Sequence, residues 1–474
     1  MNRPVIATGA AIFLVLTVFF LSYPVTLSTA RVFNNYNEGW NAYHAQSVID
    51  GDDLYHGRDA LVVNNYPPLY FMLLAGSSIF SNDLVLSGRV LSLSAFIICA
   101  LLIALIIFSL YRSLFLAVFA FCFFICYFIL HDIDYISIND PQWTGHLVQL
   151  LALFLIIKQP DSRTAIAVSS FLLVISGFIK HILVPLPLAV FLYLVASKHR
   201  FWKEWLIISI FCLGIAFALC FFIYGSDFFT SLFGNPRNYS LKHAYWKFLY
   251  WSDLIVPLML FVPVFLFVCK YSRTDKLLLL YLVCSLVIGG LFIGGKGVVH
   301  NALFDLLIAL ILIACSTLFY IGNMSVKFLY KSLITGLLIA YILYPAVSLS
   351  YNLRVVKKLS LLHVLPVYED ITAHTVAIIE KYDDPVACEN LALCYWAGKE
   401  FFLDYFNIGE RIRLDDRGQR DLLISMISNK ELKLIHIEPD STEKRLPDII
   451  VSAIEDNYYL IDKNVYGHIY APTP

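Results

Sequence analysis

The stretch at residues 31–70 reads RVFNNYNEGWNAYHAQSVIDGDDLYHGRDALVVNNYPPLY, and it decides how the rest of the chain is interpreted. It follows an apolar segment, residues 5–27, that is long enough to cross a bilayer. Connections between membrane helices are usually short, so a long one with its own carboxylates and aromatic rings indicates a site. The alternative is an interfacial loop whose rings lie at the level of the lipid headgroups. Its acidic and aromatic residues include Glu38, Asp50, Asp52, Asp53, Asp59, Tyr36, Trp40, Tyr43, Tyr55 and Tyr66.

The composition defines the class of protein. Of the 474 residues, 59% are hydrophobic and 15% are charged, and the mean hydropathy is +0.74. Soluble domains are about 45–50% apolar and about 25% charged, so this composition predicts a multi-pass membrane protein. The net charge of -1 and the lack of a basic tract exclude nucleic acid as a partner.

Hydropathy predicts about eleven transmembrane helices. The apolar segment at residues 67–80 is too short to span, and it is interpreted as a re-entrant or interfacial helix. The first apolar run is interpreted as an uncleaved span, because Tyr23 and Pro24 make a poor signal-peptide cleavage site. The predicted spans lie near residues 5–27, 85–110, 114–131, 143–157, 164–179, 182–197, 205–224, 253–269, 277–293, 301–321 and 332–350.

Lysine and arginine set the expected orientation. They gather in one set of short connections, which the positive-inside rule assigns to the cytoplasm together with the N-terminus. The first loop (residues 28–84), the 131–142 and 225–252 loops and the chain after residue 349 then face the extracytoplasmic (periplasmic) side of the inner, or plasma, membrane. Arg354, Lys357 and Lys358 argue against the last crossing.

The tail, residues 351–474, differs in composition from the membrane module at residues 1–350. It alternates short β-like pieces (385–388, 401–406, 432–437 and 465–470) with helical patterns (369–382 and 417–428), which predicts a small extracytoplasmic α/β domain. Cys388 and Cys394 are the only cysteines outside apolar spans. In an oxidising compartment they can form a disulfide, and two free thiols in the domain core are the alternative.

Charged residues at membrane depth are costly, which makes them functional-site hypotheses. Lys180 and His181 lie between two apolar runs, where a lysine suits a phosphate headgroup or snorkels to the interface, and Arg89 admits the same two interpretations. The 131–142 loop carries three acids, Asp132, Asp134 and Asp140, on the same predicted side as Glu38.

The segment GGLFIGGKGVVHNALFD, residues 289–305, places Lys296, His300, Asn301 and Asp305 on that side as well. It nearly matches a nucleotide-binding P-loop, but Gly297 replaces the required Ser or Thr and the site faces away from the cytoplasm. The remaining interpretations are an anion-binding turn for a lipid phosphate and a flexible connection. The spacing of His and Asp residues does not match a zinc site.

Several of these motifs resemble the GT-C superfamily of integral membrane glycosyltransferases. They are Asn37-Glu38-Gly39-Trp40, Tyr66-Pro67-Pro68-Leu69-Tyr70, Asn139-Asp140-Pro141-Gln142, Lys180-His181 and the glycine-rich turn before His300-Asn301. The pattern is most similar to bacterial family 39-like members, the group of protein mannosyltransferases and aminoarabinose transferases. The resemblance covers about residues 1–350, and it implies no known activity for the tail.

This resemblance implies transfer of a sugar, with inversion, from a polyprenyl-phosphate donor to an unidentified envelope acceptor. Glu38 matches the catalytic base by position, and Asp140 and Asp52 are further catalytic candidates. Several members carry a pair of acids where this chain has one, so Asp50, Asp52 and Asp53 are the alternatives for the partner of Glu38. That departure puts a metal-assisted reaction in doubt; no cofactor is certain, and a divalent cation stays open. The donor phosphate would contact Lys180, His181, Arg89, Lys296 and His300, and the sugar or acceptor would contact Trp40, Tyr43, Tyr66 and Asn301.

Two other classes of protein also fit charged residues at membrane depth. A lipid or polysaccharide transporter or flippase is favoured by inverted repeats and paired broken helices, which the sequence does not display. A non-catalytic envelope-assembly protein would depend mainly on the tail. All three classes contact membrane lipids, and only an enzyme separates the sugar from its lipid.

Overall fold

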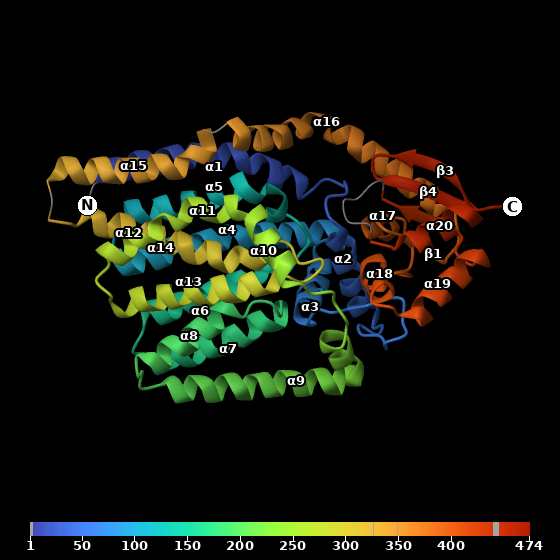
Figure 1. The fold of residues 1–474 in the computed structure, drawn as a ribbon, viewed down its shortest axis with the longest axis horizontal. Helices are drawn as coiled ribbons and strands as arrows, with labels where there is room; N and C mark the ends of the chain where they lie inside the picture. The colour runs from blue at the N-terminus through green and yellow to red at the C-terminus, as the bar shows by residue number, and fades with distance from the viewer. Residues whose placement is uncertain (1–2, 326, 348, 439–444) are drawn as a thin grey trace.

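The computed structural model describes residues 3–325, 327–347, 349–438 and 445–474. A bundle of long helices forms one side of the molecule and a small α/β domain forms the other (Figure 1). The N-terminus lies at the end of the bundle away from this domain, which we call the far end, and the C-terminus lies in the domain. The structure therefore confirms a helical multi-pass membrane protein with a small C-terminal α/β domain.

The bundle is built around one buried helix. Every residue of α14 from Phe304 to Leu318 is buried, which is the pattern of a helix at the centre of a core. Side chains of Asp83, Ser113, Ser162 and Ser272 accept backbone N–H groups at the starts of α4, α5, α7 and α13. The helices of the bundle are α1 (Arg3–Leu27), α4 (Leu84–Tyr111), α5 (Leu114–Ile136), α6 (Gln142–Lys158), α7 (Arg163–Ile179), α8 (Pro185–Ala196), α9 (Trp202–Phe233), α10 (Leu241–Tyr250), α11 (Ser252–Met259), α12 (Phe261–Val268), α13 (Arg273–Phe292), η2 (His300–Leu303), α14 (Phe304–Gly322) and α15 (Phe328–Val347).

Each of the eleven predicted spans overlaps a helix among the described residues, and the span at 253–269 overlaps two, α11 and α12. Not every one of these helices is long enough to cross a bilayer. Among the described residues, six helices are long and apolar enough, and a seventh span is formed if α10 and the α11–α12 segment, which are bent by 66°, count as one. By contrast, α6 and α7 have 17 residues each and α8 has 12. The expected count of eleven is therefore not confirmed.

The first loop folds into helices of its own. Asn35 caps the start of α2 (Tyr36–Asp50), and Gly51 ends it with a φ of 77°, which favours glycine. The short apolar segment at residues 67–80 forms α3 (Leu69–Gly76) and η1 (Ser77–Ile79).

The C-terminal domain contains a four-stranded sheet with the order β1-β2-β4-β3. β1 and β2 are parallel, with Val386 opposite Leu434, and the other pairs are antiparallel. The predicted strand at 401–406 is wrong, because Asp404 caps a helix there; β3 was not predicted as a separate strand. The elements are α16 (Leu349–Glu380), β1 (Val386–Cys388), α17 (Leu391–Trp396), α18 (Tyr405–Arg413), α19 (Arg417–Ser428), β2 (Leu434–Ile437), α20 (Asp448–Asn457), β3 (Tyr458–Asn464) and β4 (Gly467–Pro472).

The disulfide proposed between Cys388 and Cys394 is present, with the two Cα atoms 6.0 Å apart. It links the end of β1 to α17, which is the helix that packs on the first loop. The bond therefore shapes the surface through which the domain contacts the membrane module.

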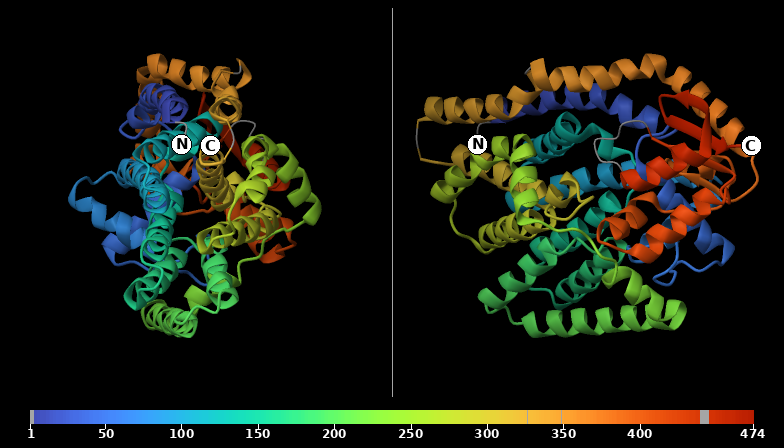
Figure 2. Two further views of the ribbon diagram at one scale, coloured as in Figure 1. Left: turned by 90° about the vertical axis from the view of Figure 1, so that its left-hand side faces the viewer. Right: turned by 45° about the vertical axis from the view of Figure 1, so that its right-hand side comes forward.

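The domain packs against the first loop through α2 and α17 (Figure 2). The hydroxyl of Tyr36 and the indole N–H of Trp40 donate to the two oxygens of Asp404, at 3.0 and 3.1 Å. Gly39 lets the two helices approach, since a Cβ there would lie 2.2 Å from the backbone nitrogen of Ala392.

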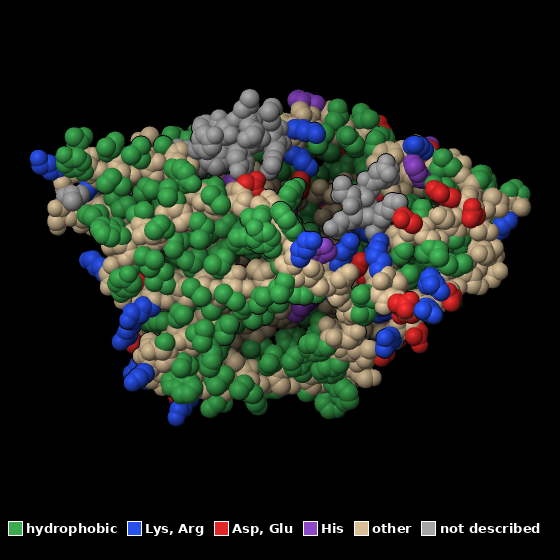
Figure 3. All heavy atoms as spheres, viewed as in Figure 1, with side chains coloured by type: hydrophobic (Ala, Val, Ile, Leu, Met, Phe, Trp, Pro, Cys, Tyr) green, Lys and Arg blue, Asp and Glu red, His purple; other side chains and the backbone are tan. Residues whose placement is uncertain are grey.

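Lys and Arg side chains also gather at the far end of the bundle (Figure 3).

We expect Gly39→Ala to weaken the docking of the domain, because backbone atoms of α17 must shift to admit the methyl group. The thermal unfolding temperature of the protein in detergent should fall. Gly76→Ala is the matched control, because a Cβ at Gly76 meets no atom within 4 Å. Equal unfolding temperatures for the two variants would show that α2 and α17 are not closely packed.

Candidate active site

Two acid–base pairs are buried where the first loop meets the bundle. One joins Glu38 to Arg89 and the other joins Asp140 to Lys180. Their side chains are 0–1% exposed. Each buried charge costs several kcal/mol of desolvation, and this cost is offset only where its polar atoms are hydrogen-bonded. The hydrogen bonds of each pair are therefore compared below.

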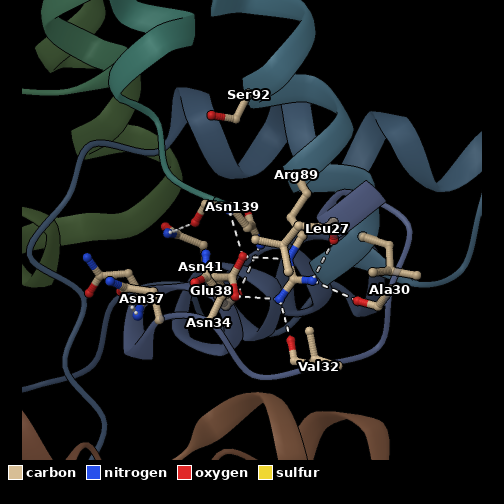
Figure 4. A network of polar contacts seen from close by, with 12 residues as sticks. Leu27, Ala30, Val32, Asn34, Asn37, Glu38, Asn41, Arg89, Ser92 and Asn139 are labelled. Atoms are coloured by element: carbon tan, nitrogen blue, oxygen red, sulfur yellow. Dashed lines mark hydrogen bonds and ion pairs between the residues drawn. The ribbon is translucent and has the colours of Figure 1, made fainter. Parts of the chain in front are cut away.

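The Glu38–Arg89 pair is fully satisfied (Figure 4). Arg89 donates two hydrogen bonds of 2.7 Å to the two oxygens of Glu38. Its remaining N–H groups donate to the carbonyls of Leu27, Ala30 and Val32, at 2.6–3.0 Å. The guanidinium thus joins α1, α2 and α4, which is a structural role.

This geometry does not fit the expected roles of Glu38 as base and Arg89 as phosphate ligand. Both Glu38 oxygens are engaged, and Oε1 also accepts the backbone N–H of Asn139 at 3.2 Å. Neither residue lines any of the described cavities. The sequence singled out both charges, but it could not indicate that they bind each other.

The Asp140–Lys180 pair is only partly satisfied. Lys180 Nζ lies 2.6 Å from Asp140 Oδ1, which also accepts the backbone N–H of Gln142 at 2.8 Å. Oδ2 of Asp140 has no well-aligned hydrogen bond within the described part of the chain, although Tyr135 lies beside it. A buried carboxylate oxygen left in this state requires an explanation, and a substrate hydroxyl is one.

Tyr66 covers this pair. Its ring centroid is 5.4 Å from Lys180 Nζ and 5.6 Å from the ring of His181. Tyr66 also lines a recess of about 60 Å³ that it shares with Asn37, Asn65 and Arg237. Tyr66 therefore borders both the recess and the Asp140–Lys180 pair.

The side chain of His181 is exposed to solvent on one side, and protein atoms surround the rest of it. Burial, followed by the charges of Arg237 and Lys180, lowers the pKa of His181 to about 4. The imidazole is consequently neutral at pH 7. In this form His181 would contact the donor phosphate through a hydrogen bond and not through charge, and its role as a phosphate ligand stays a prediction.

The glycine-rich turn forms another wall of the recess. Gly297 has a φ of +74°, and a Cβ there would lie 2.2 Å from the ring of Phe406 in the C-terminal domain. The backbone N–H of Lys296 donates to Asn238, and those of Gly294, Gly295 and Val298 bond within the turn. These four amides are therefore not free to bind an anion, and Lys296 can contribute only its side chain.

The structure gives His300 and Asn301 partners other than Lys180. His300 Nε2 lies 2.7 Å from Asp132 and lines a separate cavity of about 560 Å³. Asn301 donates to the hydroxyl of Tyr135 and to Gln142, at 2.6 and 3.1 Å. Asn301 therefore joins α6 to the start of α14, and both its amide hydrogens are engaged.

Three residues of the first loop also differ from expectation. Trp40 is 4% exposed and its indole nitrogen is bound to Asp404, so only an edge of the ring reaches the recess. The hydroxyl of Tyr43 donates to the carbonyl of Lys399 at 2.8 Å. Asp52 is exposed and lines a different cavity, so the structure does not bring it together with Asp140.

Arg237 is the site residue that the sequence reasoning missed. It lies in the predicted outward loop 225–252, stacks 5.8 Å from the ring of Phe406, and is exposed to the recess. The available signal was an arginine on the side of the membrane that the positive-inside rule leaves poor in basic residues.

The described residues form no group of three His, Cys, Asp or Glu side chains able to hold a metal ion.

We expect Glu38→Gln to destabilise the fold by about 3–5 kcal/mol, because it leaves the Arg89 charge buried without its partner. Thermal unfolding in detergent measures this. Glu204→Gln is the matched control, since it breaks an exposed Arg163–Glu204 pair worth about 0–1 kcal/mol. A stable Glu38→Gln protein that has lost sugar transfer would instead restore Glu38 as the base.

Comparison with known proteins gives a match in structure alone. No protein-family model and no curated protein matches the chain. ArnT from Cupriavidus metallidurans bound to undecaprenyl phosphate superposes with a TM-score of 0.62 at 12% identity, covering 97% of each chain. Its apo state gives 0.62 at 13% identity, again over 97% of each chain.

The oligosaccharyltransferase from Archaeoglobus fulgidus gives a TM-score of 0.57 at 10% identity, covering 97% of this chain and 74% of the other. These matches extend through the C-terminal domain, beyond the part of the chain in which the sequence motifs lie. The predicted resemblance is confirmed at the level of the fold: the chain has the fold of the GT-C superfamily of integral membrane glycosyltransferases.

Proposed function

We propose that this protein is an inverting membrane glycosyltransferase that moves a sugar from a polyprenyl-phosphate donor to an envelope acceptor. The observation that carries the proposal is the buried Asp140–Lys180 pair, in a GT-C fold beside a recess lined by Arg237. Among the described residues, Oδ2 of Asp140 has no well-aligned hydrogen bond and lies beside Tyr135. Support for the lipid carrier comes from the undecaprenyl phosphate bound to the similar ArnT structure.

In this proposal Asp140 acts as the general base. Its Oδ2 accepts the proton of an acceptor hydroxyl, whose oxygen then attacks the anomeric carbon of the sugar. The bond from that carbon to the phosphate oxygen breaks, and polyprenyl phosphate leaves with the electron pair. Lys180 holds Oδ1 of Asp140 and thereby aims Oδ2, and it offers its remaining N–H groups to the donor.

Arg237 and Lys296 supply the positive charge for the donor phosphate. Neither side chain forms an ion pair among the described residues, and both belong to segments that contact the recess. Arginine binds phosphate in a bidentate manner and lysine as a point charge, so the two are complementary. His181 is neutral and is proposed to hydrogen-bond the sugar or phosphate.

We further propose that the recess and the C-terminal domain face the extracytoplasmic side of the inner membrane. The basic residues at the opposite end of the bundle support this orientation through the positive-inside rule (Figure 3). A lipid flippase remains distinguishable by experiment, because it moves the lipid-linked sugar intact.

Purified protein mixed with radiolabelled polyprenyl-phosphate sugars and an envelope fraction tests the activity. The proposal expects labelled sugar to leave the lipid and to appear in the acceptor fraction. Movement of intact labelled lipid between the leaflets of proteoliposomes, with no loss of sugar, would favour the flippase instead.

We expect Asp140→Asn to lower transfer by about 10²-fold or more, because it removes the base and keeps the shape of the side chain. Asp275→Asn is the matched control: Asp275 is also buried, but it forms a capping box at the start of α13. The two sites lie at opposite ends of α6, about 25 Å apart by its 17 residues. Similar losses in both variants would contradict the assignment.

Arg237→Met should weaken the binding of undecaprenyl phosphate by about tenfold, the value of one charge-assisted hydrogen bond. Arg200→Met is the control, because Arg200 is likewise exposed and lies 4.6 Å from a phenylalanine ring, that of Phe201. Native mass spectrometry of the two variants with the lipid measures the effect. Unchanged binding in Arg237→Met would remove Arg237 from the donor site.

A further inference from the structure

The largest described cavity lies between the first loop and the C-terminal domain, and the proposed reaction leaves it unused. Its volume is about 840 Å³, within the range of small-molecule sites. One side is formed by α2 and the residues that follow it, and the other by the end of α17 and the residues after it, 395–401.

The cavity is acidic, and its cations are already engaged. Five carboxylates and two cations line it. Arg31 pairs with Asp83 at 2.9 Å, and Lys399 Nζ donates to the carbonyls of Glu380 and Tyr382 at 3.2 and 2.6 Å. The carboxylates without a cation partner among the described residues are Asp50, Asp52, Asp53 and Glu400, and all four are exposed.

A buried histidine provides an independent sign of a ligand. His44 lines the cavity and is 1% exposed, and its Nε2 has no hydrogen-bond partner among the described residues. Burial lowers the pKa of His44 to about 3, so the imidazole is neutral and can exchange a hydrogen bond with a hydroxyl group. Its ring is held by Trp40 at 4.2 Å and by Phe401 at 5.6 Å.

Aromatic rings form the apolar part of the wall. Tyr43 stacks on Phe401 with 5.1 Å between centroids, and Tyr395 meets Tyr43 edge-on at 5.5 Å. Trp396 also lines the cavity and donates its indole N–H to Asp83 at 3.1 Å. Rings that are held rigidly in this way offer their faces to sugar rings or to ammonium groups.

We propose that this cavity binds the saccharide part of the acceptor, a sugar with hydroxyl or ammonium donors and no anionic group. The unpaired carboxylates accept hydrogen bonds from such donors, and they repel phosphate and carboxylate groups, so the donor lipid phosphate is excluded. This inference rests on the proposed function, since it names the acceptor of that reaction.

The location suits an acceptor site. His44 and Trp40 lie one turn apart on α2, and they line the cavity and the recess respectively. The cavity and the recess are thus lined by neighbouring residues of α2, so a saccharide in the cavity would lie next to the recess. The charges divide accordingly, with cations beside the recess and carboxylates in the cavity.

The test measures binding of three trisaccharides to the full-length protein in detergent by isothermal titration calorimetry. They are a cationic glucosamine trimer, a neutral N-acetylglucosamine trimer and an anionic galacturonate trimer. We expect the cationic or the neutral trimer to bind, which distinguishes ammonium from hydroxyl recognition, and we expect the galacturonate trimer not to bind. Failure of both the cationic and the neutral trimer, or binding of galacturonate, would overturn the proposal.

The double variant Asp52→Asn/Asp53→Asn should lower the affinity for the trimer by about tenfold, because it removes two charged acceptors. Both side chains are exposed and asparagine keeps their shape, so the fold should be unaffected. Asp456→Asn, an exposed carboxylate on α20 outside the cavity, should leave binding unchanged. Equal affinity in the two variants would contradict the site. Undecaprenyl phosphate binding, measured in parallel, reports on the proposed function separately, and the Asp52/Asp53 change should not alter it.

Discussion

The buried pair of Glu38 and Arg89 is the interaction on which the rest of the site depends. Desolvating the two charges costs several kcal/mol for each ion, and this cost is offset only when all polar atoms find partners. Here every N–H group of the guanidinium has one, so the pair fixes the end of α1, the first loop and α4 in one arrangement. Glu38 also binds Asn139 through its Oε1 and its backbone carbonyl, which places the next residue, Asp140.

The two ion pairs show how satisfaction of polar atoms separates structure from chemistry. Both pairs are buried, and each joins two charged residues that are far apart in the sequence. In the Glu38–Arg89 pair every polar atom has a partner. In the Asp140–Lys180 pair, within the described chain, Oδ2 of Asp140 has no well-aligned hydrogen bond and the partners of Lys180 Nζ are Asp140 and the ring of Tyr66. Such an arrangement is costly unless a substrate completes it, and this is the physical reason for assigning the chemistry to Asp140 and Lys180.

The C-terminal domain is part of the site and not only an appendage. Asp404 holds Tyr36 and Trp40 of the first loop, while Phe406 covers Gly297 and stacks with Arg237. The domain therefore closes one wall of the recess and one wall of the larger acidic cavity. Loss of docking would open both hollows at once.

The sequence by itself determined the class of protein and most of its helices, because apolar length and periodicity are local properties. It also singled out Asp140, Lys180 and Tyr66 as candidates and allowed a Cys388–Cys394 bond, since charge at membrane depth and cysteine placement are visible without coordinates. Which charge meets which was decided only by the tertiary structure: Arg89 could equally have faced a phosphate until the fold placed Glu38 against it. The sequence shows which charged groups require a partner, but only tertiary packing decides whether that partner is another residue of the chain or is left to a ligand.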